Sequence, residues 1–112
     1  MTDNAFLVFI ALWGAHEIFD YAGQGDFMAK AKNRVAPIPT IPWWQVLKGH
    51  AVIHGTAVAL ITQIWWMFAF EAIIHFITDD LKCRGMITYN TDQAIHLGSK
   101  VIWFAVWVSV QS

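Results

Sequence analysis

Every histidine of the sequence has a metal-ligand type of side chain four positions away. The four pairs are His16 with Asp20, His50 with His54, His75 with Asp79, and Asp92 with His96. Because residues four apart share one face of an α-helix, both members of a pair can reach a single ion. Imidazole and carboxylate groups at this spacing are typical of helical zinc motifs and of metal-bearing bundles. The sequence therefore predicts a metal centre assembled from these eight side chains.

The chemistry of such a centre depends on the ion that it binds. Nitrogen and oxygen donors of this kind suit one or two divalent transition-metal ions, namely zinc, manganese or iron. A bound ion with a position left for water would favour hydrolysis. We expect Asp92 to act as a ligand or a general base, and Lys82 to stabilise an anionic substrate. Two alternatives stay open: Asp92 as a cap of its helix, and the whole set as a metal-free polar network or proton relay.

The composition indicates what kind of elements must position these residues. The sequence has 112 residues, of which 57% are hydrophobic and 13% are charged, and it contains seven tryptophans. A soluble domain of this length cannot bury so much apolar surface. We therefore expect an integral membrane protein whose main partner is the lipid bilayer. The sequence has no basic stretch interleaved with aromatic residues, which argues against a nucleic-acid partner.

Four segments are long and apolar enough to be expected as membrane helices. They are residues of about 3–22, 43–62, 66–83 and 92–111. Between the first two, the segment 24–42 contains three prolines and is expected to lie at the surface. The proline-free run from 43 to 83 is too long for one crossing, so we expect a reversal at 62–66. The predicted fold is all-α, a single transmembrane domain (1–112) forming an up-down-up-down four-helix bundle.

All four pairs lie toward the same end of this predicted bundle. They fall near the end of the first and third helices and near the start of the second and fourth. The basic residues also lie at or near this end, namely Lys30, Lys32, Arg34, Lys48, Lys82, Arg84 and Lys100. By the positive-inside rule, we expect a multi-pass protein with its site at the cytoplasmic surface and both termini on the far side. An anionic lipid or another phosphate-containing molecule is then a candidate substrate.

The order and spacing of four motifs resemble a known family. The motifs are His-Glu-Ile-Phe-Asp at 16–20 followed by Gln24, Gly-His-Ala-Val-Ile-His at 49–54, His-Phe-Ile-Thr-Asp-Asp-Leu-Lys at 75–82, and Asp-Gln-Ala-Ile-His at 92–96. Together they look like domain-of-unknown-function family 3307, small membrane proteins of bacteria and their phages. The resemblance implies a bacterial inner membrane and supports the paired residues together with Lys82 and Gln93. It names no reaction. More distantly, the chain is similar to membrane-bound metal-dependent hydrolases.

These observations favour a membrane-embedded metal-dependent hydrolase acting near the cytoplasmic membrane surface. One alternative is an ion or proton translocator, although the far half is apolar apart from Glu71 and Gln63. Another is a non-catalytic membrane interaction protein of a phage or a bacterium. Glu71 lies four residues before His75 and is expected to extend the site or to carry protons, with a protonated, hydrogen-bonded carboxyl as the alternative. Asp80 is expected to face the surface.

Overall fold

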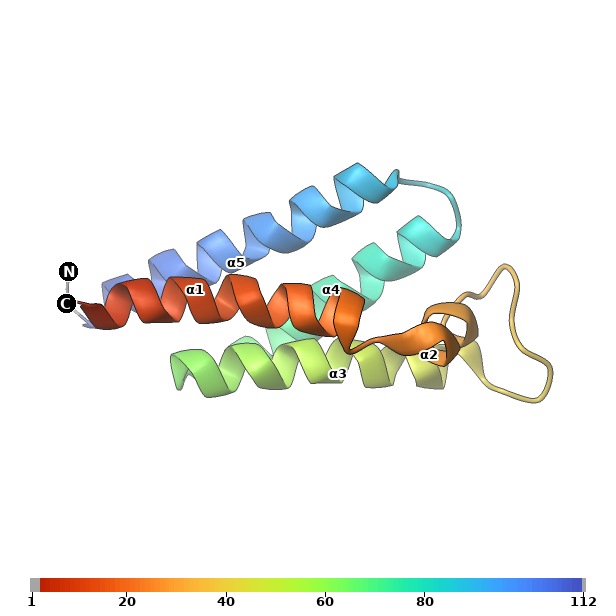
Figure 1. Cartoon of the computed structure of the whole chain (residues 1–112), viewed down its shortest axis with the longest axis horizontal. Coiled ribbons are helices and arrows are strands. Elements are labelled where there is room, and N and C mark those ends of the chain that lie inside the picture. Colours follow the sequence, from red (N-terminus) through yellow and green to blue (C-terminus); the bar gives the residue numbers. More distant parts are fainter. Residues whose placement is uncertain (1–2, 112) are drawn as a thin grey trace.

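The computed structural model describes residues 3–111, and its regular elements are all helical (Figure 1). In chain order they are α1 (Asp3–Glu17), the π-helical turn η1 (Ile18–Ala22), α2 (Gly25–Ala31), α3 (Trp43–Thr62), α4 (Met67–Cys83) and α5 (Tyr89–Gln111). The all-α prediction is confirmed. The bounds of α3 coincide with the expected range 43–62, and those of α4 differ from 66–83 by one residue.

The long helices α1, α3, α4 and α5 run in alternating directions (Figure 1). The start of α1 and the end of α5 lie together at one end of the molecule, whereas α2 and the loop after it lie at the other. The most extensive packing is between α3 and α4, while α1 packs against both α5 and α3. Residues near the α2 end of each long helix are therefore brought close together across the helix interfaces.

The reversal between α3 and α4 lies where the sequence predicted it. Gln63 adopts the left-handed conformation with a φ of 60°, and its N–H donates to Ala59 O at 2.8 Å. This geometry ends α3 and turns the chain within the expected segment 62–66. A second reversal at Gly85, whose φ is 73°, separates α4 from α5.

The start of α5 differs from the expectation. The helix begins at Tyr89, and Thr88 caps it by accepting a hydrogen bond from the Thr91 N–H at 3.1 Å. Asp92 therefore lies one turn inside the helix, and its side chain contacts His96 instead of capping the helix. The alternative of Asp92 as a cap is wrong because a capping residue stands upstream.

The long helices show inverted burial, in which polar side chains lie inside the bundle and large apolar side chains lie on its surface. Buried side chains are more often polar or charged than apolar, and a small apolar core of Leu12, Val58, Met67 and Trp103 lies on the side of the site away from α2. Large hydrophobic side chains point outward instead. Phe6 is 72% exposed and Leu60 is 66% exposed.

Fewer of the described helices than expected are long and apolar enough to cross a membrane. Among the described helices, α5 is long and apolar enough to cross a membrane. The segments Asn4–Tyr21 and Gly25–Ala31 meet the same criterion only as a pair bent by 79°. These properties support one crossing helix, or two if the bent pair forms one span, and not the expected multi-pass arrangement.

The backbones of α3 and α4 approach each other closely at Gly55. A Cβ atom at this position would lie 2.6 Å from Phe68 O and 3.2 Å from Ala72 Cβ. We expect Gly55→Ala to lower the free energy of unfolding by about 1–3 kcal/mol, because the α4 backbone must move to admit the methyl group. Equilibrium unfolding in detergent micelles, followed by circular dichroism, measures this change.

Gly49 supplies the matched control on the same helix. A Cβ atom there meets nothing within 4 Å. Gly49→Ala is therefore expected to leave the packing intact and to raise stability by up to about 1 kcal/mol, because alanine is the better helix former. Equal effects of the two substitutions would contradict a close approach at Gly55.

Candidate metal centre

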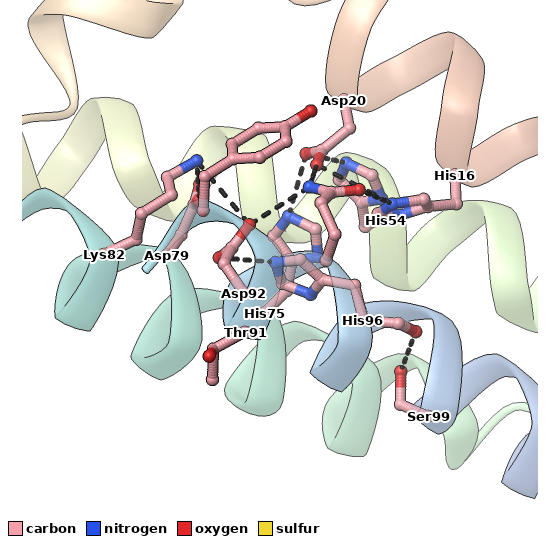
Figure 2. A network of polar contacts seen from close by, with 12 residues as sticks. His16, Asp20, His54, His75, Asp79, Lys82, Thr91, Asp92, His96 and Ser99 are labelled. Atoms are coloured by element: carbon pink, nitrogen blue, oxygen red, sulfur yellow. Dashed lines mark hydrogen bonds and ion pairs between the residues drawn. The ribbon is translucent and has the colours of Figure 1, made fainter. Parts of the chain in front are cut away.

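The predicted site residues are gathered between the four long helices (Figure 2). None of the eight paired side chains is more than 6% exposed. Seven of them belong to groups whose donor atoms lie within 4.8 Å of one another, and His16 does not. The groups are Asp20 with His50, His54 and His75; His75 with Asp79 and His96; and Asp20 with Asp92 and His96. Each long helix or its extension therefore contributes at least one donor.

Asp20 owes its central position to the π-helical turn at the end of α1. Residues Ile18–Ala22 form η1, whose wider turns rotate the helix face relative to α1. The contact between His16 Nε2 and Asp20 Oδ2 is consequently long, at 3.7 Å. The carboxylate is instead directed toward imidazoles of α3 and α4, among them His54 and His75 (Figure 2). Single π turns of this kind are frequent at functional sites.

Four donor atoms lie close to one another in the first group. Asp20 Oδ1 lies 3.1 Å from His50 Nε2, 3.4 Å from His54 Nε2 and 3.5 Å from His75 Nε2. The Nε2 atoms of His50 and His75 are 3.2 Å apart. Ligand atoms at the corners of a tetrahedron with bonds of about 2.0–2.1 Å are separated by roughly 3.3–3.4 Å. The separations between these donors therefore match those expected around a tetrahedral ion.

Two further observations show that the first group fits a cation. The buried His54 Nε2 has no hydrogen-bond partner in the described part of the chain, although buried polar atoms are normally paired. Within 4.0 Å, the ion-pair partners of Asp20 among residues 3–111 are imidazoles, with no lysine or arginine. A buried carboxylate without a permanent cation is costly. A bound metal ion would satisfy both groups.

The other oxygen of Asp20 faces a second set of side chains. Gln93 Nε2 donates to Asp20 Oδ2 at 2.9 Å and to Asp92 Oδ2 at 3.1 Å, while its Oε1 lies 3.0 Å from His16 Nε2. Asp92 Oδ1 is 3.1 Å from His96 Nε2. This amide joins α5 to η1 and holds two buried carboxylates near each other.

Lysines neutralise Asp79 and Asp92 at the α2 end of the site. Lys32 Nζ donates to Asp79 Oδ2 at 2.7 Å and also to Gln24 Oε1. Lys82 Nζ lies 3.1 Å from Asp79 Oδ1 and 3.7 Å from Asp92 Oδ2. The Lys82 side chain is 25% exposed, whereas that of Lys32 is 3% exposed. Lys82 is therefore the cation of this group that an outside anion can reach.

Sequence reasoning missed the role of Lys32. It stands just after α2 in a segment expected to lie at the surface, and its side chain becomes buried only because this segment folds back over Asp79. Long apolar runs predict helices, but they do not predict that the chain folds back over a distant residue. The nearby Gln24, which belongs to the first motif, holds the amine from the other side.

A deeper ion pair continues the polar network beneath His75. Glu71 Oε1 forms an ion pair with Lys100 Nζ, 2.5 Å away, and accepts a hydrogen bond from Trp103 Nε1 at 3.1 Å. Glu71 Oε2 lies 3.6 Å from His75 Nδ1. The expectation that Glu71 extends the site agrees with these contacts. Lys100, which was expected at or near the site end, is 5% exposed and lies inside the bundle against Glu71.

Asp80 is buried, which corrects the expectation that it faces the surface. Its carboxylate accepts hydrogen bonds from Arg34 Nε at 3.0 Å and Arg34 Nη2 at 2.8 Å, and Arg84 Nε lies 3.4 Å away. The Arg34 guanidinium also stacks over the Trp43 ring, with 4.3 Å between its carbon and the ring centroid. This arrangement joins the loop before α3 to the end of α4, beside the candidate metal centre.

Comparison of the chain with protein-family models, curated proteins and solved structures gives no match. The class of site is therefore defined by its own geometry, a buried group of three imidazoles and one carboxylate with further carboxylates beside it.

Proposed function

We propose that this chain is a membrane-embedded metal-binding protein and that it acts as a metal-dependent hydrolase near the cytoplasmic membrane surface. The observation that carries the proposal is the convergence of Asp20 Oδ1 with three imidazole Nε2 atoms at separations of 3.1–3.5 Å. Zinc, manganese and iron all bind such donors.

The inverted burial supports a membrane position for all four long helices. The mean hydropathy of α3 and α4 is lowered by site residues such as His50, His54 and Asp79. These side chains are buried inside the bundle and do not contribute to its outer surface. The outward face of α4 carries Phe70 and Ile73, which are 54% and 57% exposed. The outer surface of these helices is therefore more apolar than their mean hydropathy indicates. Buried polar groups inside a membrane bundle commonly mark functional sites.

The proposed orientation follows from the basic residues. The α2 end carries Lys30, Lys32, Arg34, Lys82 and Arg84, whereas the start of α1 and the end of α5 lie at the opposite end (Figure 1). Under the positive-inside rule the metal centre then faces the cytoplasm of a bacterial cell. We also propose that the chain belongs with family 3307, on the four motifs that contain the site residues.

The chain's own groups suggest how a substrate would bind. When bound, a divalent metal would supply Lewis acidity and would promote the ionisation of water. Lys82 Nζ stands between Asp79 and Asp92 and remains 25% exposed, so it can hold an anionic oxygen at the mouth of the site. A lipid or another molecule with a phosphate group fits this charge. Asp92 serves as a ligand or accepts a proton from water.

The test is metal content, measured by elemental mass spectrometry on detergent-purified protein. Wild-type protein is expected to retain at least one transition-metal ion per chain, and His50→Ala/His54→Ala is expected to lose it, because two donors of the first group are removed. The metal-loaded wild type should then hydrolyse the lipid phosphomonoester phosphatidic acid in mixed micelles to diacylglycerol and inorganic phosphate, and chelation should abolish this release.

Lys48→Ala is the control for this experiment. Lys48 lies on α3 beside the histidine pair, but its side chain is exposed and its amine lies 5.8 Å from the Trp44 ring centroid. The Lys48→Ala protein should keep its metal ion. Folded wild-type protein without metal under all loading conditions would overturn the proposal, and a metal-loaded protein without phosphate release would overturn the reaction while keeping the binding site.

An ion or proton translocator is the second candidate, favoured by the contact between His75 and Glu71. This contact carries the polar network one helical turn deeper, to Lys100. Beyond it, the buried side chains of the described chain are mostly apolar, and the buried Thr62 hydroxyl donates its hydrogen bond to Val58 O at 2.8 Å. A conducting path needs polar groups at further depths, so the hydrolase remains the better-supported function.

A further inference from the structure

The two oxygens of Asp20 face different donor sets. Asp20 Oδ1 lies among His50, His54 and His75, as described above. Asp20 Oδ2 lies on the side of α5, where it accepts a hydrogen bond from Gln93 Nε2 at 2.9 Å. A carboxylate whose two oxygens face separate sets of ligand atoms is suited to bridge two ions, as in many two-metal hydrolytic sites.

The donors on the α5 side are buried and rich in carboxylate. Asp20, Asp92 and His96 each offer an atom within 4.8 Å of the others, and both Asp92 and His96 have no exposed surface. The Gln93 amide nitrogen lies between the carboxylates of Asp20 and Asp92. A neutral amide cannot balance two negative charges in a low-dielectric interior.

The single lysine beside Asp92 offsets only part of the charge of the two carboxylates. Lys82 Nζ is 3.7 Å from Asp92 Oδ2 but only 3.1 Å from Asp79 Oδ1, so it is shared between two carboxylates. No other lysine or arginine in the described chain lies within 4.0 Å of Asp92. The position therefore has the donors of a cation site and, with two carboxylates against one shared lysine, a net negative charge in the metal-free protein.

We propose that a second divalent cation binds to Asp20, Asp92 and His96, with Asp20 bridging it to the ion held by the first group. This inference rests on the proposed metal-binding function and assigns Asp92 as a ligand. The first position offers three imidazoles and one carboxylate, whereas the second offers two carboxylates and one imidazole. Oxygen-rich donor sets suit manganese better than imidazole-rich ones, so the second position is expected to accept Mn²⁺ readily.

The experiment measures the number of Mn²⁺ ions per chain in detergent-purified protein after loading and desalting. Wild-type protein is expected to hold two ions, and Asp92→Asn is expected to hold one. Electron paramagnetic resonance gives a readout independent of activity. Two bridged Mn²⁺ ions in the wild type should give an exchange-coupled spectrum, and the single ion of the variant should give an isolated six-line spectrum.

Asp80→Asn provides the matched control, because it removes a buried carboxylate outside the metal groups. Asp80 is 4% exposed and is paired with Arg34 and Arg84. It should retain two ions and the coupled spectrum. Circular dichroism establishes that each variant keeps its helices.

The outcomes separate the further inference from the proposed function. One ion in the wild type, with an uncoupled spectrum, overturns the second site and leaves the first. No ion in the wild type overturns both. Loss of both ions in folded Asp92→Asn, or loss of an ion in Asp80→Asn, also overturns the inference, because the second position would then not be a separate site that depends on Asp92.

Discussion

Asp20→Asn is expected to weaken metal binding by more than about 100-fold, the upper range for losing a group that only supports a ligand. The reason is that Asp20 belongs to two of the three donor groups, the one with three histidines and the one with Asp92 and His96. Its carboxylate carries the negative charge that faces the imidazoles of α3 and α4. Asparagine keeps the shape of the side chain but removes this charge.

Asp20→Asn is not expected to lower the stability of the metal-free protein. Without an ion, Asp20 is a buried carboxylate whose ion-pair partners in the described chain are imidazoles. Because such a charge is costly to bury, metal-free Asp20→Asn should be at least as stable as metal-free wild type. Only the wild type should gain stability from added metal, by about 2.7 kcal/mol at a concentration 100 times the Kd.

Thermal unfolding in detergent, with chelator and with Zn²⁺, measures both effects. Asp80→Asn is the control, because Asp80 is buried but is paired with two arginines. It should lose stability and keep the response to metal. A metal-free polar network predicts the reverse for Asp20→Asn, with lower stability in chelator and no change in any metal response.

Helix periodicity predicted the part of the site that each helix carries by itself. Two residues four apart, such as His50 and His54, must share a face whatever the tertiary structure. The symmetric placement of the pairs also predicted the reversal at 62–66, and the left-handed Gln63 ends α3 there. These features depend only on local geometry, so they can be read from spacing.

Contacts between distant segments were not predictable in the same way. Lys32 reaches Asp79 because the segment after α2 folds back, and Lys100 is buried because Glu71 stands opposite to it on α4. Asp80 was expected at the surface, but Arg34, distant in sequence, covers it. Each of these partners is fixed by tertiary packing, for which a single sequence has no periodic signal.

Asp92 shows why helix boundaries were less predictable than helix faces. The residues Asn90, Thr91 and Asp92 are all capping types, so composition alone favours a start there. Thr88 caps the helix instead, and α5 gains one turn. That turn places Asp92 beside His96 with its carboxylate inside the bundle, where it faces Gln93 and Lys82.

The ion pair of Glu71 and Lys100 is expected to give the largest change in stability. Both side chains are nearly or fully buried, with 2.5 Å between Lys100 Nζ and Glu71 Oε1. Lys100→Met leaves Glu71 with hydrogen bonds from Ser99 and Trp103 but without its cation. Breaking a buried pair in this way costs about 3–5 kcal/mol.

The double variant Glu71→Gln/Lys100→Met separates the charge from the packing. It removes both charges while keeping similar side-chain volumes, so it should recover most of the stability lost in Lys100→Met. The pair between the exposed Arg84 and the buried Asp80 is the comparison: Arg84→Met should cost less than about 1 kcal/mol, because Arg34 remains on Asp80. Equilibrium unfolding in micelles measures all three. A double variant as unstable as Lys100→Met would show that the hydrogen bonds and packing of Glu71 matter more than its ion pair.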